Sequence, residues 1–180
     1  MSEKYRWIIT VFFFLIVMLF FNRKVRLFSL VKEQMLVFKN AKTNKLSLWD
    51  ILCFLVFPII VAIILVYRLN FIIDNNLANL LTTVFSVVFT VLFGFAAIMI
   101  GKIDSPNKLE KQVAEETFVS ILSSTIMSLI DAVLSIVITQ LDSTICLGIV
   151  SAVILTLSFI IIMLILLITK RTFLLYTDHK

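Results

Sequence analysis

The 180-residue chain has few of the residues on which turns, redox sites and catalytic sites depend: 3 glycines, 2 prolines, 2 cysteines and a single histidine. Two cysteines cannot build a disulfide framework, and so few glycines exclude a collagen-like chain. Charged residues make up only 15%, whereas 61% of residues are hydrophobic, which excludes disorder. Because a soluble domain of this length buries only about 70% of its surface, the apolar surplus must face lipid.

Five runs with few or no charges approach the roughly 20 residues that a helix needs to cross a bilayer. They cover about 5–21, 48–67, 80–100, 118–141 and 145–169. The sequence therefore predicts an all-α fold: a polytopic transmembrane helical bundle of four to five spans, forming one integral membrane domain over 1–180. The first run is short, and no signal-peptidase site follows it, so we expect an uncleaved anchor. If it does not cross, four spans remain.

Local signals mark the helix ends. Ser47-x-x-Asp50 is a capping box, and Trp49 and Tyr67 lie at the two ends of the second run, where amphipathic rings mark the lipid–water boundary. Pro58, in the middle of that run, should kink its helix, and a hinge role would need two states. We expect the third run to stop at Gly101-Lys102. A tight turn at 142–144 should join the last two runs into a hairpin.

Nothing interrupts the helical pattern between Ser105-Pro106 and Leu141. Such a helix would have about 36 residues and a length of roughly 54 Å, which exceeds the bilayer thickness. Residues 107–117 should therefore protrude into the cytoplasm, with Lys111 and Glu115 placed as an i, i+4 pair.

Basic residues predict the orientation, because Lys and Arg near span ends stay on the cytoplasmic side. Placing the loops 22–47 and 102–117 in the cytoplasm puts thirteen basic residues inside and three outside. The C-terminus is then cytoplasmic and the N-terminus external.

The loop 22–40 is amphipathic at helical spacing. One expected face is apolar, with Val25, Phe28, Val31, Met35 and Phe38, and another carries Arg26, Glu33 and Asn40. A basic amphipathic helix is expected on the inner surface of the membrane, where it binds anionic lipid or docks a protein partner. No aromatic platform accompanies the charge, so direct nucleic-acid binding is not expected. The candidate contacts for lipid or partner are Arg23, Lys24, Arg26, Lys32, Lys39, Lys108 and Lys111.

Small residues form a stripe about 80° wide along the third run. They are Thr83, Ser86, Thr90, Gly94, Ala97 and Gly101. Small side chains let helix backbones approach closely in lipid. The stripe serves either packing inside one subunit or a seam between subunits of a homo-oligomer.

Polar residues form a second stripe, within about 100° of the fourth run. They are Ser120, Ser124, Ser128, Asp131, Ser135 and Thr139. A carboxylate in mid-membrane is costly, so Asp131 is either protonated or in contact with water. Two interpretations stay open: hydrogen bonding between helices, or a hydroxyl-lined path for ions or protons.

Signatures of catalysis, cofactor binding and metal binding are missing: there is no Ser/His pair, no phosphate-binding loop and no His/Glu cluster, and His179 lies in the tail. We therefore expect a protein that is not an enzyme and needs no cofactor or metal.

Two main hypotheses for the function remain. The first is an oligomeric scaffold or sensor that docks a cytoplasmic protein, and the second is an ion or proton channel. A proton-coupled exporter that uses Asp131 is a third possibility.

The predicted topology combines four or five spans with a basic inner loop, Arg23–Lys45, and a cytosolic helix segment, Lys108–Glu116. This topology resembles the small multi-pass membrane subunit of bacterial antiphage defence pairs such as Kiwa. The resemblance implies a homo-oligomer of the bacterial inner membrane that senses envelope perturbation. It also implies a cytoplasmic, nucleic-acid-binding effector that the membrane subunit holds or releases.

Overall fold

The computed structural model describes residues 27–38, 47–103, 108–141 and 143–177. Throughout these ranges all regular structure is helical. Four helices are long and apolar enough to cross a membrane, which confirms the predicted polytopic helical bundle. They are Leu48–Arg68, Asn75–Gly101, Glu110–Ile138 and Thr144–Phe173. The predicted first span, 5–21, lies outside the described residues.

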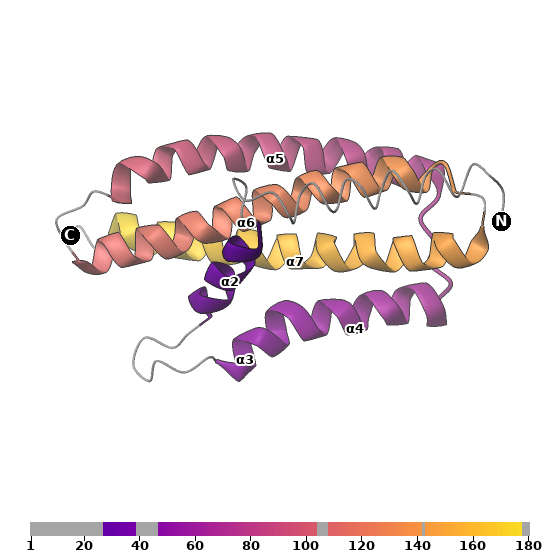
Figure 1. Cartoon of the computed structure of the whole chain (residues 1–180), viewed down its shortest axis with the longest axis horizontal. Coiled ribbons are helices and arrows are strands. Elements are labelled where there is room, and N and C mark those ends of the chain that lie inside the picture. Colours follow the sequence, from indigo (N-terminus) through magenta and orange to yellow (C-terminus); the bar gives the residue numbers. More distant parts are fainter. Residues whose placement is uncertain (1–26, 39–46, 104–107, 142, 178–180) are drawn as a thin grey trace.

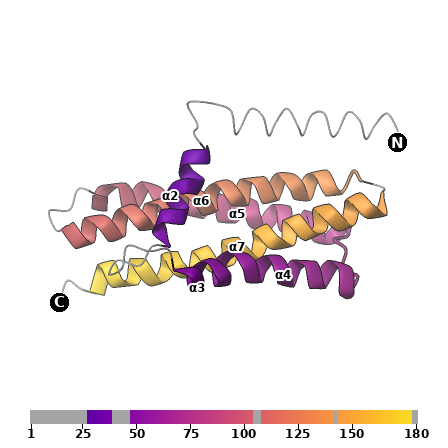
Figure 2. The ribbon, with the colours of Figure 1, turned by 60° about the horizontal axis from the view of Figure 1, so that its bottom comes forward.

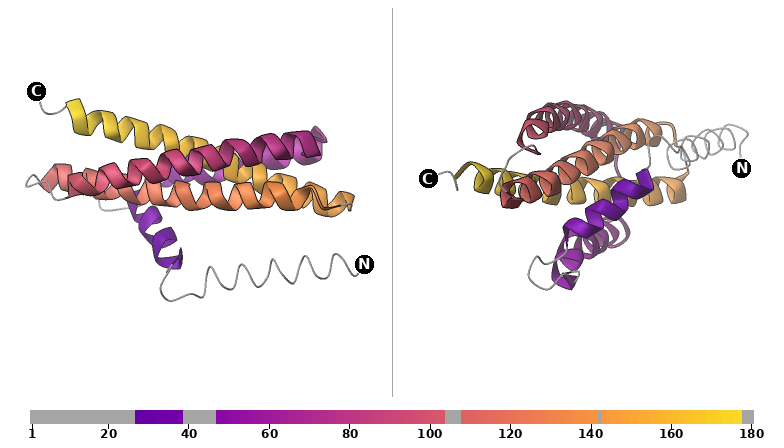
Figure 3. Two further views of the ribbon diagram at one scale, coloured as in Figure 1. Left: turned by 90° about the horizontal axis from the view of Figure 1, so that it is seen from above. Right: turned by 60° about the vertical axis from the view of Figure 1, so that its left-hand side comes forward.

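The described part of the chain forms a short crossing helix and the four long helical segments named above, which lie roughly side by side (Figure 1). In chain order the elements are α2 (Leu27–Val37), α3 (Leu48–Ile51), η1 (Leu52–Val56), α4 (Phe57–Ile63), η2 (Ile64–Arg68), α5 (Asn75–Ile103), α6 (Lys108–Ile138) and α7 (Thr144–Thr177). The elements α3 to η2 follow one another without a break and form one rod. Helix α6 packs along both α5 and α7, and the α3–η2 rod packs on α7. Helix α2 crosses the long axis of the bundle and packs on α6 (Figures 2 and 3).

The α3–η2 rod begins where the capping box predicts. The Ser47 Oγ atom accepts a hydrogen bond of 3.3 Å from the Asp50 N–H. Trp49 and Tyr67 are both exposed, at the two ends of the rod. Pro58 lacks the N–H that would bond four residues back, and the preceding turn widens to π geometry, with the Phe57 N–H bonded to the Leu52 carbonyl. The sequence predicts a kink at Pro58, and the structure shows a π turn, Leu52–Val56, directly before it.

Helix α5 begins earlier than the predicted span, after Asp74, whose Oδ1 atom accepts a 2.8 Å hydrogen bond from the Leu77 N–H. At the other end the helix runs to Ile103, and its membrane-spanning part ends at Gly101, where the sequence predicts the stop. Met99 is buried against Ala114 of α6, and Ile103 extends that contact, so packing on α6 holds this end of α5.

Helix α6 confirms the prediction of one long, unbroken helix, although it ends at Ile138 and not at Leu141. Its 31 residues span about 46 Å. Residues Ser105 and Pro106 lie outside the described part of the chain. The predicted hairpin with α7 is confirmed, and the Leu147 N–H bonds to the Ser143 carbonyl at 2.9 Å as α7 begins.

The predicted apolar face of α2 is observed in part. Met35 is half-buried and Phe38, directly after the helix, is buried, with its ring 5.3 Å from the ring of Phe54. Val31, expected on the same face, is 50% exposed, whereas Leu27 and Gln34 are buried. Val25 and the side chain of Phe28 lie outside the described residues.

We predict that Ile121→Ala lowers the free energy of unfolding by about 1–3 kcal/mol, because it leaves a void where α5, α6 and α7 meet. Leu129→Ala, on the exposed side of the same helix, is the matched control and should change it by less than about 0.5 kcal/mol. Reversible unfolding in mixed micelles measures both. Equal losses would show that α6 does not have the buried side described here.

Candidate functional site

The polar stripe of α6 faces the inside of the subunit. Five of its six members are fully buried: Ser120, Ser124, Ser128, Asp131 and Ser135. Thr139 lies just past the end of α6 and is half-buried. Because α5, α7 and α2 pack on α6, the stripe is enclosed by helices of the same chain. It does not lie on a surface that several copies could arrange around a shared pore.

Most hydroxyl groups of the stripe bond to their own helix. Ser120 donates to the Glu116 carbonyl at 3.0 Å and Ser124 to the Ser120 carbonyl at 2.9 Å. Ser128 donates to the carbonyl of Thr125 at 2.9 Å. A hydroxyl that bonds one turn back needs neither water nor a neighbouring helix, so these serines are satisfied inside an apolar bundle.

Asp131 forms the polar link between α6 and α7. The Ser158 hydroxyl lies 2.9 Å from the Asp131 Oδ2 atom and 2.8 Å from the Ile154 carbonyl. The other carboxyl oxygen, Oδ1, has no protein partner, and neither does the hydroxyl of Ser135, one turn further along α6. The carboxyl therefore joins two helices and keeps one oxygen for a further hydrogen bond.

Sequence reasoning missed the polar residues of α7. Ser151 and Ser158 are both buried, and they lie seven residues apart, which places them on one side of a helix. The Ser151 Oγ atom accepts a 3.2 Å hydrogen bond from the Ile73 N–H in the connection before α5. Their spacing was the signal that could have found them.

The small-residue face of α5 points away from the rest of the subunit. All six members, Thr83, Ser86, Thr90, Gly94, Ala97 and Gly101, are exposed. A Cβ atom added at Gly94 or Gly101 would meet nothing within 4 Å. The buried residues Phe85, Leu92 and Met99 lie on the opposite side of the helix. Among residues 27–38, 47–103, 108–141 and 143–177, no helix packs on this face, so the described part of the chain does not support the interpretation of packing inside one subunit.

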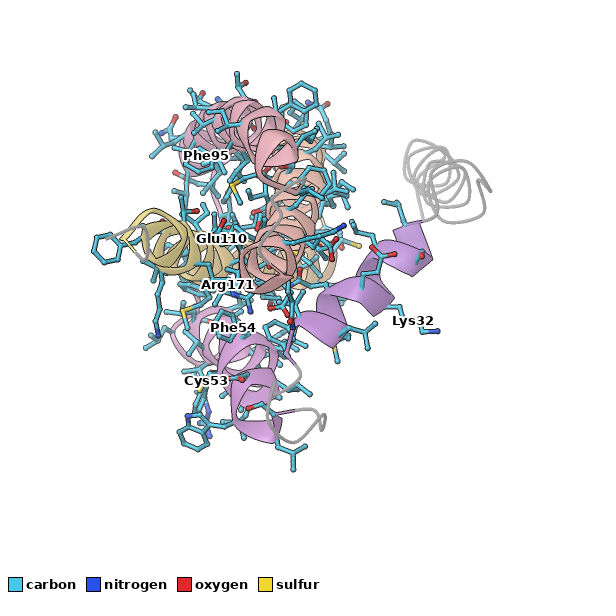
Figure 4. All side chains as sticks on the ribbon, turned by 90° about the vertical axis from the view of Figure 1, so that its left-hand side faces the viewer. Lys32, Cys53, Phe54, Phe95, Glu110 and Arg171 are labelled. Atoms are coloured by element: carbon cyan, nitrogen blue, oxygen red, sulfur yellow. The ribbon has the colours of Figure 1, made fainter. Side chains whose placement is uncertain are left out.

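Arg171 ties three elements together at the end of the bundle where α3 and α6 begin and α5 and α7 end, called here the basic end. Its Nη2 atom lies 3.2 Å from Glu116 Oε2 of α6 and 3.5 Å from the Val37 carbonyl at the end of α2. Figure 4 looks onto this end and places Arg171 between α6 and the α3–η2 rod. Sequence reasoning counted Arg171 only as a charge and missed this role.

The segment of α6 expected to protrude is braced by its neighbours. Ala114 is fully buried beside Met99 of α5 and Ile168 of α7. The predicted pair of Lys111 and Glu115 is present at 4.0 Å, on the exposed side. The segment is thus one edge of a three-helix unit and not an isolated rod.

The candidate lipid or partner contacts are only partly within the described chain. Lys32 on α2 and Lys111 on α6 are exposed. The others, Arg23, Lys24, Arg26 and Lys39, lie outside the described residues, as does the side chain of Lys108.

The chain matches no protein-family model, no curated protein and no solved structure. Within the described ranges, no group of three or more His, Cys, Asp or Glu side chains could hold a metal ion.

We predict a coupling energy of about 0.5–1.5 kcal/mol between Asp131 and Ser158, the range of hydrogen bonds between membrane helices. A double-mutant cycle of Asp131→Ala and Ser158→Ala, followed by unfolding in mixed micelles, measures it. The control is Ser135→Ala, which removes a buried hydroxyl that has no partner and should not destabilise the fold. Strictly additive effects of the two alanine substitutions would contradict the link.

Proposed function

We propose that the protein is a non-enzymatic, multi-pass scaffold of the bacterial inner membrane that self-associates through α5 and docks a cytoplasmic protein at the basic end. The observation that carries the proposal is the small-residue face of α5, which is exposed along its whole length. Other exposed faces of the bundle carry large apolar side chains, such as Phe57, Ile60 and Ile64 on the α3–η2 rod.

In a lipid environment, this face of α5 is suited to pack against another helix. Apolar side chains gain nothing by leaving lipid for another apolar surface, so helices associate where backbones can approach closely. The hydroxyls of Thr83, Ser86 and Thr90 already bond to their own helix, so they need no water at the seam. Gly94 and Gly101 leave room for a second backbone. A second copy of α5 is the partner of matching shape.

The basic end is the surface proposed for the cytoplasmic partner. Lys111, Lys170 and Arg171 lie there, together with the acidic Asp50, Glu115 and Glu116. The opposite end carries Arg68, so the basic residues alone have the asymmetry expected when the basic end is cytoplasmic. Contacts of Arg171 with Glu116 hold α6 and α7 in register at this end. Since α6 is unbroken from there to Asp131, a tilt of the membrane part would move the docking surface.

The resemblance to the membrane subunit of Kiwa-like antiphage pairs supplies a context for this scaffold. In that context the protein senses perturbation of the envelope, and its cytoplasmic partner is a nucleic-acid-binding effector. The chain itself contacts anionic lipid and protein and binds no nucleic acid directly.

We predict that Gly94→Leu abolishes self-association while the subunit stays folded, because the new side chain points into open space in the monomer. Val91→Phe is the matched control: it adds comparable bulk at an exposed position of α5 outside the small-residue face. Light scattering of the purified protein, with thermal unfolding on the same samples, measures both effects. An oligomer that tolerates Gly94→Leu, or a wild-type protein that is monomeric, would contradict the proposed seam.

An ion or proton channel is the second candidate, with the Ser120, Ser124, Ser128, Asp131 and Ser135 stripe as its path. It is favoured by the unpartnered Asp131 Oδ1 and Ser135 Oγ atoms, which could hold a proton or a water molecule. The scaffold proposal predicts no ion flux into liposomes above the protein-free rate. Flux that falls in Asp131→Asn, with the oligomer intact, would replace the scaffold by the channel.

A further inference from the structure

A partly open cavity of about 290 Å³ lies between α2, η1, α6 and α7. Thirteen of its fifteen lining side chains are apolar and none is charged, and they include Leu30, Phe38, Phe54, Met127 and Leu164. A cavity of roughly 150 Å³ lined in this way binds benzene, so this one has room for about a dozen carbon atoms.

The cavity lies within the half of the bundle that leads to the basic end. Its lining residue Leu164 lies two helical turns from Arg171 on the same side of α7. Its inner end reaches Ile130 and Leu157, the neighbours in sequence of Asp131 and Ser158 in the middle of the bundle. Leu157 and Leu164 are about 10 Å apart along the helix, which is about two thirds of the roughly 15 Å of one hydrocarbon leaflet.

Two polar side chains in the cavity wall lack partners. Gln34 of α2 is 7% exposed, and neither atom of its amide group has a hydrogen bond. Ser123 of α6 is 4% exposed, and its hydroxyl is also without a partner. Buried polar groups are hydrogen-bonded as a rule, so two such groups in one apolar wall suit a ligand that carries a polar atom at the end of a hydrocarbon chain.

We propose that the cavity binds one acyl chain of a phospholipid from the leaflet at the basic end. The hydrocarbon lies along Leu30, Met127 and Leu164, and the ester carbonyl accepts hydrogen bonds from the Gln34 amide and the Ser123 hydroxyl. Val31, which lines the cavity and is 50% exposed, marks the side from which the chain enters.

The size and chemistry of the cavity favour an acyl chain over other occupants. One turn of a helix about 10 Å across fills roughly 400 Å³, so the cavity is too small to hold a whole helical turn. A phospholipid chain combines a narrow hydrocarbon with one carbonyl, and the bilayer surrounds the protein with it.

The test uses the full-length protein in nanodiscs of phosphatidylethanolamine and phosphatidylglycerol, with a trace of phosphatidylethanolamine that carries a photoactivatable diazirine in one acyl chain. After irradiation, peptide mass spectrometry should find label on α2 and α6 residues of the cavity, such as Met35 and Met127, in addition to exposed residues. Leu30→Trp, which fills the cavity, should reduce the label on Met127 roughly tenfold. Leu36→Trp, at an exposed position of the same helix outside the cavity, is the matched control and should leave it unchanged.

The variant Gln34→Leu distinguishes two explanations of the unpartnered amide: that it binds a lipid, or that it is a buried polar group without a ligand. If the amide holds the ester, the substitution reduces the label on Met127 several-fold. If the amide holds nothing, the substitution raises the unfolding temperature and leaves the label unchanged, which would overturn the proposal. Label confined to exposed residues of the wild-type protein would overturn it as well. None of these positions lies on α5, so this result and the test of self-association are independent.

Discussion

The structure depends on one constraint: the polar side of α6 has to be kept away from lipid. Some of its polar groups are hydrogen-bonded within α6, as the Ser124 hydroxyl is, and Asp131 is hydrogen-bonded to Ser158 of α7. The helix is accordingly packed by α5 and α7 along its length and crossed by α2. An arrangement with polar groups inside and apolar groups outside is what a solvent without hydrogen-bonding capacity requires. Large apolar side chains, which would form the core of a soluble protein, are then free to cover the outer surface.

That division gives each outer surface a distinct role. The α3–η2 rod offers lipid a wide surface of residues such as Ile60 and Ile64. The small-residue face of α5 offers a second backbone a close approach. At the basic end, Arg171 connects α7 with Glu116 of α6 and with the end of α2, so the parts that would face the cytoplasm move with the membrane helices. The proposed scaffold would need both features, a surface in contact with the membrane and a rigid connection to the end at which a partner is proposed to dock.

The spans could be located from the sequence because the thickness of the bilayer sets the length of the hydrophobic run, and this thickness is the same for every span. Sequence reasoning found the polar stripe of α6 because a carboxyl group is rare inside a membrane span and the serines around it recur at helical spacing. It placed Val31 on the inward face of α2 and did not place Leu27 and Gln34 there, since the crossing of α2 over α6 is a tertiary contact that leaves no periodic signal. The sequence also could not predict what the small-residue face contacts. A stripe that contains Gly94 and Thr90 has the same sequence pattern whether it packs on another helix of the same chain or on a second chain.

The central claim is that the small-residue face of α5 meets the same face of a second copy. Disulfide crosslinking in native membranes tests it most directly, in a background where the free cysteines Cys53 and Cys146 are replaced by alanine. The account predicts that Thr90→Cys and Ala97→Cys form crosslinked dimers under mild oxidation and that Val84→Cys and Val91→Cys, also exposed on α5, do not. Equal crosslinking at all four positions, or none at Thr90 and Ala97, would contradict it.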